Sequence, residues 1–101
     1  MAASMTSAVE KEILRPLWKI HILQHASEAP VVGHWMLEEL RDHGYRVSPG
    51  TLYPLLGRMV RLGCLSHDQR RCYRATDEGR RALTEVRKRL QELQGEVVDK
   101  D

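Results

Sequence analysis

Four arginines in the middle of the chain have the chemistry to contact a polyanion: Arg58, Arg61, Arg70 and Arg71. Residues 58–89 contain ten Lys and Arg against four Asp and Glu, a net charge of +6, whereas residues 1–57 carry −1 and residues 90–101 carry −3. The total of +2 over 101 residues does not by itself indicate a nucleic-acid partner. This segregation favours one basic face that binds a polyanion, and the alternative is a solvated, arginine-rich helix surface.

His21 and His25 stand four residues apart, a spacing that places both imidazoles on one face of a helix. Position 22 holds Ile22, so the pair lacks the glutamate of the metalloprotease motif. A protein metal site also needs more than two ligands. The sequence therefore predicts no metal site and no cofactor, and it places the two histidines on the surface or in a groove between subunits.

Cys64 and Cys72 are the two cysteines, too few for a disulfide scaffold and consistent with a reducing compartment. In a hairpin whose turn centres on Asp68, the two thiols would face each other, and a thiol-responsive protein is then one alternative. The other is that Cys64 packs as a small hydrophobic residue, as buried cysteines usually do.

The sequence contains no catalytic motif. There is no nucleophile elbow, no glycine-rich phosphate loop and no paired zinc motif. The uncharged stretches are far shorter than the roughly 20 apolar residues of a membrane span, and the first residues lack the basic start and apolar core of a signal peptide. We expect a cytoplasmic protein that is not an enzyme and has no membrane segment.

The apolar periodicity predicts a single, mainly α-helical domain with a small β-hairpin. Residues 1–8 are expected to form a disordered tail. Pro16 leaves two alternatives, because the main helix either begins near Arg15 or is kinked there. The expected elements are helices over 9–26, 31–43 and 49–62, an extended piece at 45–47, a hairpin over 64–75 and a last helix over 77–98.

The third helix has the clearest start in the chain. Ser48 is a favoured N-cap, and Pro49 loses nothing by lacking an N–H at the first helical position. Three helices followed by a hairpin constitute a winged helix-turn-helix, here residues 9–76. In that arrangement the third helix enters the major groove and the hairpin lies over phosphates.

The last helix, residues 77–98, carries apolar residues spaced three and four apart: Leu83, Val86, Leu90, Leu93 and Val97. An isolated helix of this length is marginal in water, so this seam must pack on another helix. We expect a dimerisation helix within the same domain, and the alternative is packing on the chain's own core. Leu14, Trp18 and Ile22 of the first helix are predicted to complete the dimer interface.

Two sequence stretches carry a resemblance to a known family. The first is Ser48-Pro49-Gly50-Thr51-Leu52-Tyr53-Pro54-Leu55-Leu56, followed by Arg58-Met59 and Gly63, and the second is Tyr73-Arg74-Ala75-Thr76-Asp77-Glu78-Gly79. With this spacing the chain resembles the PadR family of transcriptional regulators over roughly residues 13–93. The single C-terminal helix is similar to the smaller branch of that family. The resemblance implies a homodimeric winged-helix protein that binds double-stranded DNA, usually as a repressor.

The resemblance also implies which residues face a pseudo-palindromic operator. The candidate DNA contacts, from the family motif and the basic segment together, are Ser48, Gly50, Thr51, Tyr53, Pro54, Arg58, Arg61, Gln69, Arg70 and Arg71. Gly57 and Cys72 depart from the family, which often carries a long polar residue and a tyrosine there. The family's small aromatic effectors, which bind between subunits, make Trp18, His21 and Trp35 a candidate effector pocket, with core packing as the alternative for the tryptophans.

Two rival functions remain open from the sequence. One is a winged-helix module that binds protein rather than DNA, in which case loss of Arg58, Arg70 and Arg71 leaves function intact. The other is a DNA-binding regulator that responds to oxidants or metals.

Overall fold

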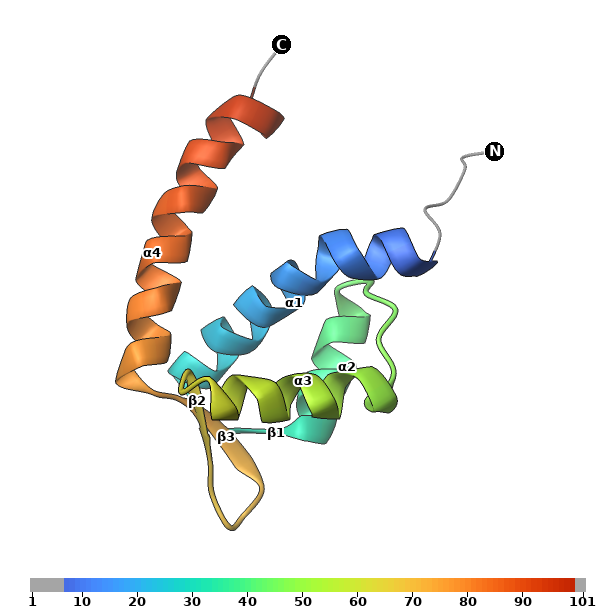
Figure 1. The fold of residues 1–101 in the computed structure, drawn as a ribbon, viewed down its shortest axis with the longest axis vertical. Coiled ribbons are helices and arrows are strands. Elements are labelled where there is room, and N and C mark those ends of the chain that lie inside the picture. The colour runs from blue at the N-terminus through green and yellow to red at the C-terminus, as the bar shows by residue number, and fades with distance from the viewer. Residues whose placement is uncertain (1–6, 100–101) are drawn as a thin grey trace.

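The computed structural model describes residues 7–99 (Figure 1). Its helices are α1 (Ser7–Glu28), α2 (Gly33–Asp42), α3 (Pro49–Arg61) and α4 (Asp77–Leu93), and α4 continues into a π-helical turn, Gln94–Val98. Three strands, β1 (Val31–Val32), β2 (Leu65–His67) and β3 (Cys72–Ala75), form an antiparallel sheet in the order β1-β3-β2. The predicted fold class, helices with a small hairpin and a long C-terminal helix, is confirmed.

The first helix begins earlier than expected. Ser7 and Ala8, assigned to the tail from the sequence, are already helical, and the rest of the expected tail lies outside the described residues. Pro16 lies inside one helix that runs from Ser7 to Glu28, so the main helix does not begin near Arg15. Figure 1 shows the N-terminal turns of α1 at an angle to the remainder, which agrees with the kink alternative.

The second helix begins later than predicted. Val31 and Val32 form β1, which pairs with Tyr73 and Cys72 of β3, and α2 starts only at Gly33. A strand of two residues is too short to show an alternating apolar pattern in the sequence, and its pairing partner lies far along the chain. The absence of a side chain at Gly33 lets the ring of Tyr53 pack against the start of α2.

Burial in the core contradicts part of the predicted dimer interface. Trp18 is 1% exposed, Ile22 0% and Leu83 3%, so all three pack inside one subunit. A second apolar stripe on α1 includes Ile13 and Leu17, and these two side chains lie exposed. Both stripes are apolar, so periodicity could not tell which one the other helices cover.

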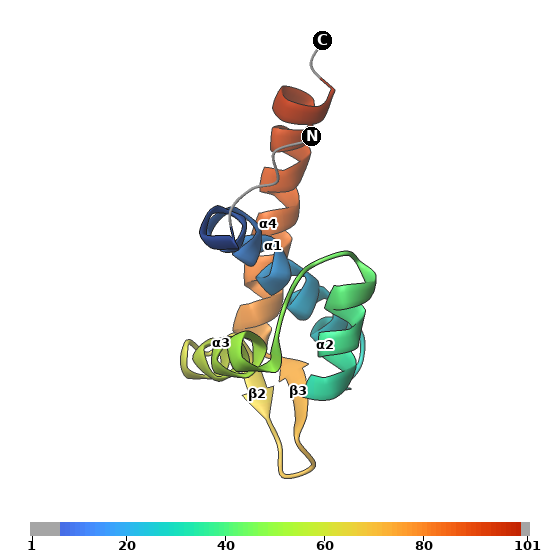
Figure 2. The same cartoon turned by 90° about the vertical axis from the view of Figure 1, so that its right-hand side faces the viewer.

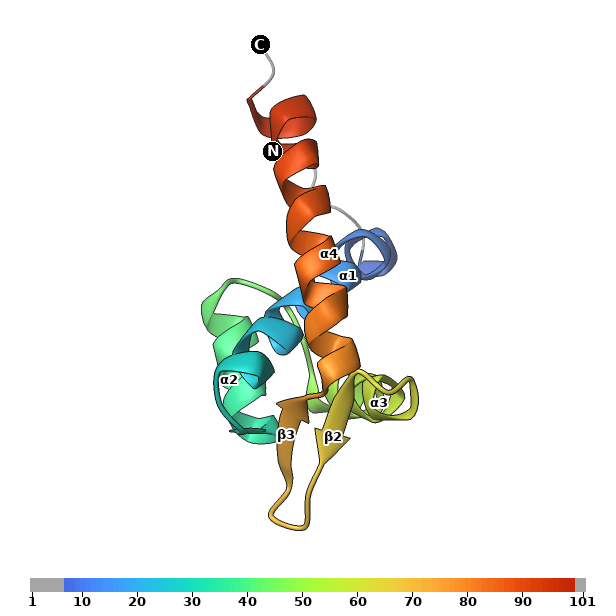
Figure 3. The same ribbon diagram turned by 90° about the vertical axis from the view of Figure 1, so that its left-hand side faces the viewer.

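The last helix is anchored at its start and free at its end. The Thr76 hydroxyl accepts from the Gly79 N–H (3.0 Å) and donates to the Gly63 carbonyl (2.6 Å), which ties the start of α4 to the end of α3. The predicted N-cap is therefore confirmed. Figures 2 and 3 show the rest of α4 extending away from the body, past α1, to the end of the molecule opposite the hairpin.

Candidate nucleic-acid interface

The local sequence around Ser48 builds the start of α3 much as expected. Ser48 is extended (φ −104°, ψ 159°), its carbonyl accepts from the Leu52 N–H at 2.9 Å, and Pro49 is the first helical residue. Its hydroxyl does not cap the helix but donates to Thr51 Oγ1 at 3.2 Å. Pro54 is tolerated inside α3 because its ring faces the turn of Gly50, which has no side chain.

The predicted DNA contacts on α3 share one face. Leu52, Leu55, Leu56 and Met59 are buried, and the residues between them at helical spacing point outward. The outward set consists of the exposed Gly50, Tyr53, Pro54, Arg58 and Arg61 and the half-buried Thr51. Gly57 lies within this face, beside the guanidinium of Arg61.

The hairpin between β2 and β3 forms the wing, residues 65–75, and Asp68 holds its tip. One carboxylate oxygen of Asp68 accepts from the N–H groups of Arg70 and Cys72, both at 2.9 Å. These backbone bonds, the one from Cys72 first, lower the pKa of Asp68. The tip therefore keeps a negative charge that fixes the backbone between Gln69 and Arg71, and Gln69, Arg70 and Arg71 are all exposed.

The backbone conformation of Arg71 is unusual for a residue other than glycine. Among the described residues other than glycine, Arg71 alone has a positive φ, 63°. Its N–H donates to the Asp68 carbonyl at 3.0 Å and closes the turn in which this left-handed position occurs. A left-handed backbone costs a branched or long residue about 1 kcal/mol, and glycine would carry no such cost. The wing thus retains an arginine where local geometry favours glycine.

A hollow of about 500 Å³ separates the start of α3 from the wing. It brings together Tyr53 from α3 with Arg70 and Arg71 from the wing, three residues predicted from the sequence. His34 and His67 line it too, and sequence analysis missed both. His67 stacks on Tyr73, with ring centroids 4.3 Å apart, and no motif in the sequence signals this contact.

The predicted effector pocket is not one pocket. Trp18 lies in the core, whereas Trp35 is 41% exposed and lines a hollow of about 510 Å³ between the end of α1 and the start of α2. His21 lines a different groove, of about 300 Å³, between α1 and α4. The expected grouping is not supported, because Trp35 and His21 line separate hollows and Trp18 lines neither of them.

The two cysteines do not face each other. Leu65 pairs with Ala75 across the hairpin, so Cys64 lies beside Thr76, and Cys72 pairs with Val32 instead. The thiol of Cys64 donates to the Met59 carbonyl (3.2 Å), and burial raises its pKa. A raised pKa disfavours the reactive thiolate, which agrees with packing as a small hydrophobic residue.

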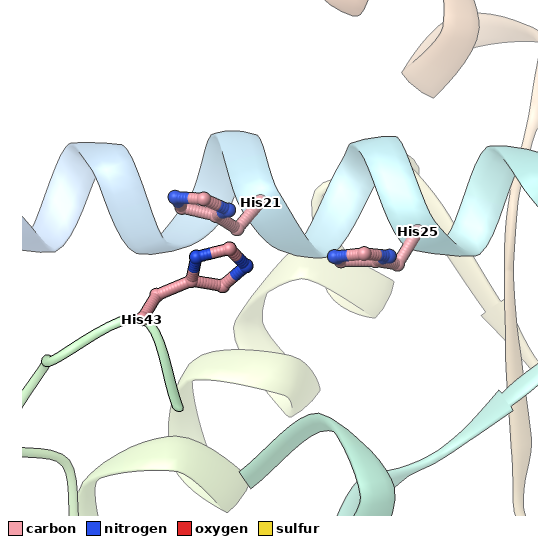
Figure 4. Close-up of side chains that lie close together, drawn as sticks. All are labelled: His21, His25 and His43. Atoms are coloured by element: carbon pink, nitrogen blue, oxygen red, sulfur yellow. The ribbon is translucent and has the colours of Figure 1, made fainter. Parts of the chain in front are cut away.

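Three histidines gather on the side of α1 that faces the end of α2. The helical spacing of His21 and His25 keeps them on one face of α1, and His43 joins them from the C-cap of α2 (Figure 4). Burial first, and then the neighbouring His43 and His25, lower the pKa of His21. The imidazole of His21 is therefore neutral at pH 7.

These elements define a class of protein. A three-helix unit whose third helix presents an outward polar face beside a basic hairpin is the architecture of winged-helix DNA-binding proteins. Residues 22–85 match the sequence profile of the transcriptional regulator PadR-like family, and this chain belongs to that family of transcriptional regulators.

Individual relatives agree with this assignment. The chain is 50% identical over 95 residues to the transcriptional regulator Rv3488 of Mycobacterium tuberculosis, a match that covers 87% of this chain and 89% of that protein. A PadR family transcriptional regulator from Eggerthella lenta superposes with a TM-score of 0.71 at 31% identity, over 90% of this chain and 87% of that one.

A PadR-like transcription factor from Bacteroides fragilis has the same fold, with a TM-score of 0.75 at 23% identity over 90% of this chain and 96% of that one. In the part of the chain that the structure describes, none of the helices is both long and apolar enough to span a bilayer.

Proposed function

We propose that this chain is a homodimeric transcriptional repressor in which α3 reads the major groove of an operator and the wing contacts phosphates. The observation that carries the proposal is that two different surfaces lie at opposite ends of the molecule, which is 47 Å long. The outward face of α3 and the wing arginines lie at one end. An apolar stretch of α4 without cover from its own chain lies at the other (Figures 1 and 3).

The DNA-facing surface is the outward face of α3 together with the wing. An α-helix fits the major groove, about 12 Å wide, and arginine is the side chain that most often pairs with guanine there. Arg58 and Arg61 extend from the later turns of α3 toward bases, and Thr51 and Tyr53 from its first turns toward phosphate or base edges. Arg70 and Arg71 of the wing, with Gln69 at its tip, hold the adjacent backbone.

The dimer surface is the free half of α4. Leu90, Leu93 and Val97 are 38%, 51% and 65% exposed, although they continue the seam whose first member, Leu83, is buried. Such a stripe on a helix is stable only against a second apolar surface. A second copy supplies one, and the exposed Ile13 and Leu17 of α1 provide further apolar contact.

The two-fold symmetry of such a dimer sets the form of the operator. It predicts a pseudo-palindrome with half-sites about one helical turn apart. A small aromatic effector would release the DNA by binding more tightly to a dimer whose α3 helices do not match the spacing of the half-sites. A ligand with equal affinity for both spacings would leave the equilibrium between them unchanged. Trp35 and the hollow it lines are the better-placed candidates for its binding site.

Fluorescence anisotropy with the DNA upstream of the protein's own gene, titrated at several salt concentrations beside a scrambled duplex, tests the proposal. We expect tighter binding to the native sequence and a steep salt dependence. The double variant Arg70→Ala/Arg71→Ala should lower the slope of log K against log salt by about 4, at roughly 0.9 per phosphate contact and with two wings per dimer. Lys11→Ala, which removes a positive charge from α1, should leave the slope unchanged.

Weak binding that is equal for both duplexes would overturn the proposal. That result would favour the alternative function, a winged-helix module that binds another protein. The arginine variants would then retain function.

A further inference from the structure

The three histidines on α1 and α2 converge on one point. His21 and His25 project from successive turns of α1, and His43 reaches them from the residue that ends α2 (Figure 4). One ring nitrogen from each lies within 4.8 Å of the other two. The rings of His21 and His43 are 4.6 Å apart between centroids and tilted by 34°.

Imidazoles placed this close repel one another when protonated, whereas neutral imidazoles do not. Neutral imidazoles carry free lone pairs, and that is the form in which histidine binds metal ions.

A carboxylate supports two of the three rings. One oxygen of Glu39, Oε2, lies 3.2 Å from His25 Nε2 and 3.1 Å from His43 Nε2. Glu39 comes from α2, one turn before His43, and its side chain is only 24% exposed. Carboxylates in this position orient the imidazoles of metal sites or supply an oxygen ligand of their own. On the other side, the Tyr45 hydroxyl lies 3.2 Å from His21 Nε2.

We propose that His21, His25 and His43, supported by Glu39, bind a late first-row divalent metal ion, with Zn²⁺ as the ion that suits them best. Three imidazoles and a carboxylate form a nitrogen-rich donor set of the kind that Zn²⁺ takes in tetrahedral sites. The site lies away from the α3 and wing surface, and the inference rests on the geometry of the histidines rather than on DNA binding.

The site closes by small side-chain movements. Zinc–nitrogen bonds of about 2.0–2.1 Å in a tetrahedron bring neighbouring nitrogens to roughly 3.3 Å. The present limit of 4.8 Å must therefore contract. His43 is free to make that movement, because its side chain is 45% exposed and follows the last turn of α2. The bound ion would fasten α1 to the end of α2, where the connection to α3 begins.

The remaining histidines provide matched controls. His34 pairs with Glu38 at 3.5 Å on the surface of α2, with 75% of its side chain exposed, an ordinary (i, i+4) pair. His67 stacks on Tyr73 in the wing. Neither belongs to a group of three potential ligands among the described residues.

Titration of the full-length, chelator-treated protein with Zn²⁺, followed by calorimetry, tests the site. We expect one ion per chain. Substituting Co²⁺ should give the intense visible absorption of a tetrahedral complex. At a hundredfold excess of free Zn²⁺ over Kd, the melting temperature should rise by roughly 10–20 °C.

Single-residue variants distinguish this site from nonspecific binding of Zn²⁺ to the surface. His43→Ala removes an exposed ligand with little risk to folding and should weaken Zn²⁺ binding at least 100-fold, and His25→Ala should do the same. Glu39→Gln should weaken it about 10-fold. His34→Ala and His67→Ala should bind as the wild type does. The inference is overturned if the wild type takes up no ion, or if His43→Ala binds Zn²⁺ as tightly as His34→Ala.

Discussion

The two ends of the molecule expose different kinds of side chain. At the wing end the accessible residues include a group that is charged or carries a polar tip, among them Tyr53, Arg58 and Arg70. The free end of α4 instead exposes an aliphatic stripe, in which Leu93 and Val97 are more than half exposed. A charged surface is stable in water and remains available to DNA, whereas an aliphatic stripe on a projecting helix favours lasting burial against another chain.

The difference also shows in how each end is held. The wing is fixed by the Asp68 carboxylate and by strand pairing, so its arginines project from a defined backbone. The first turns of α4, around Leu83, pack in the core, and Arg87 donates a hydrogen bond to Gln24 Oε1 of α1 at 2.6 Å. Beyond Arg87, Leu90, Leu93 and Val97 are exposed. The wing end is therefore complete within one subunit, and the α4 end is completed by a second copy in the function proposed above.

Leu93→Glu should have the largest effect on function. It places an unpaired charge in the proposed interface, so the dimer dissociates and the two half-sites are no longer bound by linked subunits. We expect DNA affinity to fall about 100-fold or more, with the helical circular dichroism signal retained because Leu93 is exposed in one subunit. Sedimentation equilibrium and anisotropy measure the two effects.

Gln91→Glu is the matched control for that variant, since it adds the same charge to α4 outside the apolar seam. It should dimerise and bind DNA as the wild type does. A Leu93→Glu protein that still dimerises would show that the free half of α4 is not the interface.

Gly79→Ala should damage both ends, because it acts where they join. The added methyl group would collide with the Cys64 carbonyl, which lies at the junction of α3, the wing and α4. Backbone cannot move aside cheaply, so we expect a loss of about 2–3 kcal/mol in the free energy of unfolding, measured by urea titration. Gly95→Ala, where an added methyl meets open space, should be neutral or slightly stabilising.

Arg58→Ala should distinguish base contacts from phosphate contacts within the DNA-facing surface. For an arginine that reads a base, we expect a loss of about 1–3 kcal/mol in binding and a relaxed preference at one operator position. Arg70→Ala should instead weaken binding to all sequences equally and lower the salt slope by about 2, since the dimer has two wings. Anisotropy on a set of single-base operator variants measures both, and identical behaviour of the two variants would contradict the assigned roles.

Arg71→Gly should have the smallest effect and should separate stability from binding. Removing the left-handed arginine relieves local strain, partly offset by the added freedom of glycine in the unfolded chain, so we expect stabilisation of up to about 1 kcal/mol. The salt slope of DNA binding should fall at the same time, by about 2 for the two wings of the dimer. Arg70→Gly, at a position without positive φ, should lose the contact and gain no stability, which thermal unfolding would reveal.

Much of the fold could be predicted where its signals are local. Ser48-Pro49 and Gly63 bound α3 within a residue or two, and Thr76 caps α4, because caps and turns act over a single helical turn. The outward face of α3 followed from the spacing of its buried leucines in the same way. The strand at Val31 could not be predicted, because it exists only through pairing with β3.

The sequence by itself determined the winged-helix architecture, the basic segment at the wing and α3, and the apolar seam of α4. Each of these features depends on residues that are close together in the sequence. Only the tertiary structure decided which apolar stripe of α1 is buried, and so moved Trp18 and Ile22 from the expected interface into the core. It also brought His43 to His21 and His25. Periodicity fixes which residues share a face, but the packing of distant elements decides what that face meets.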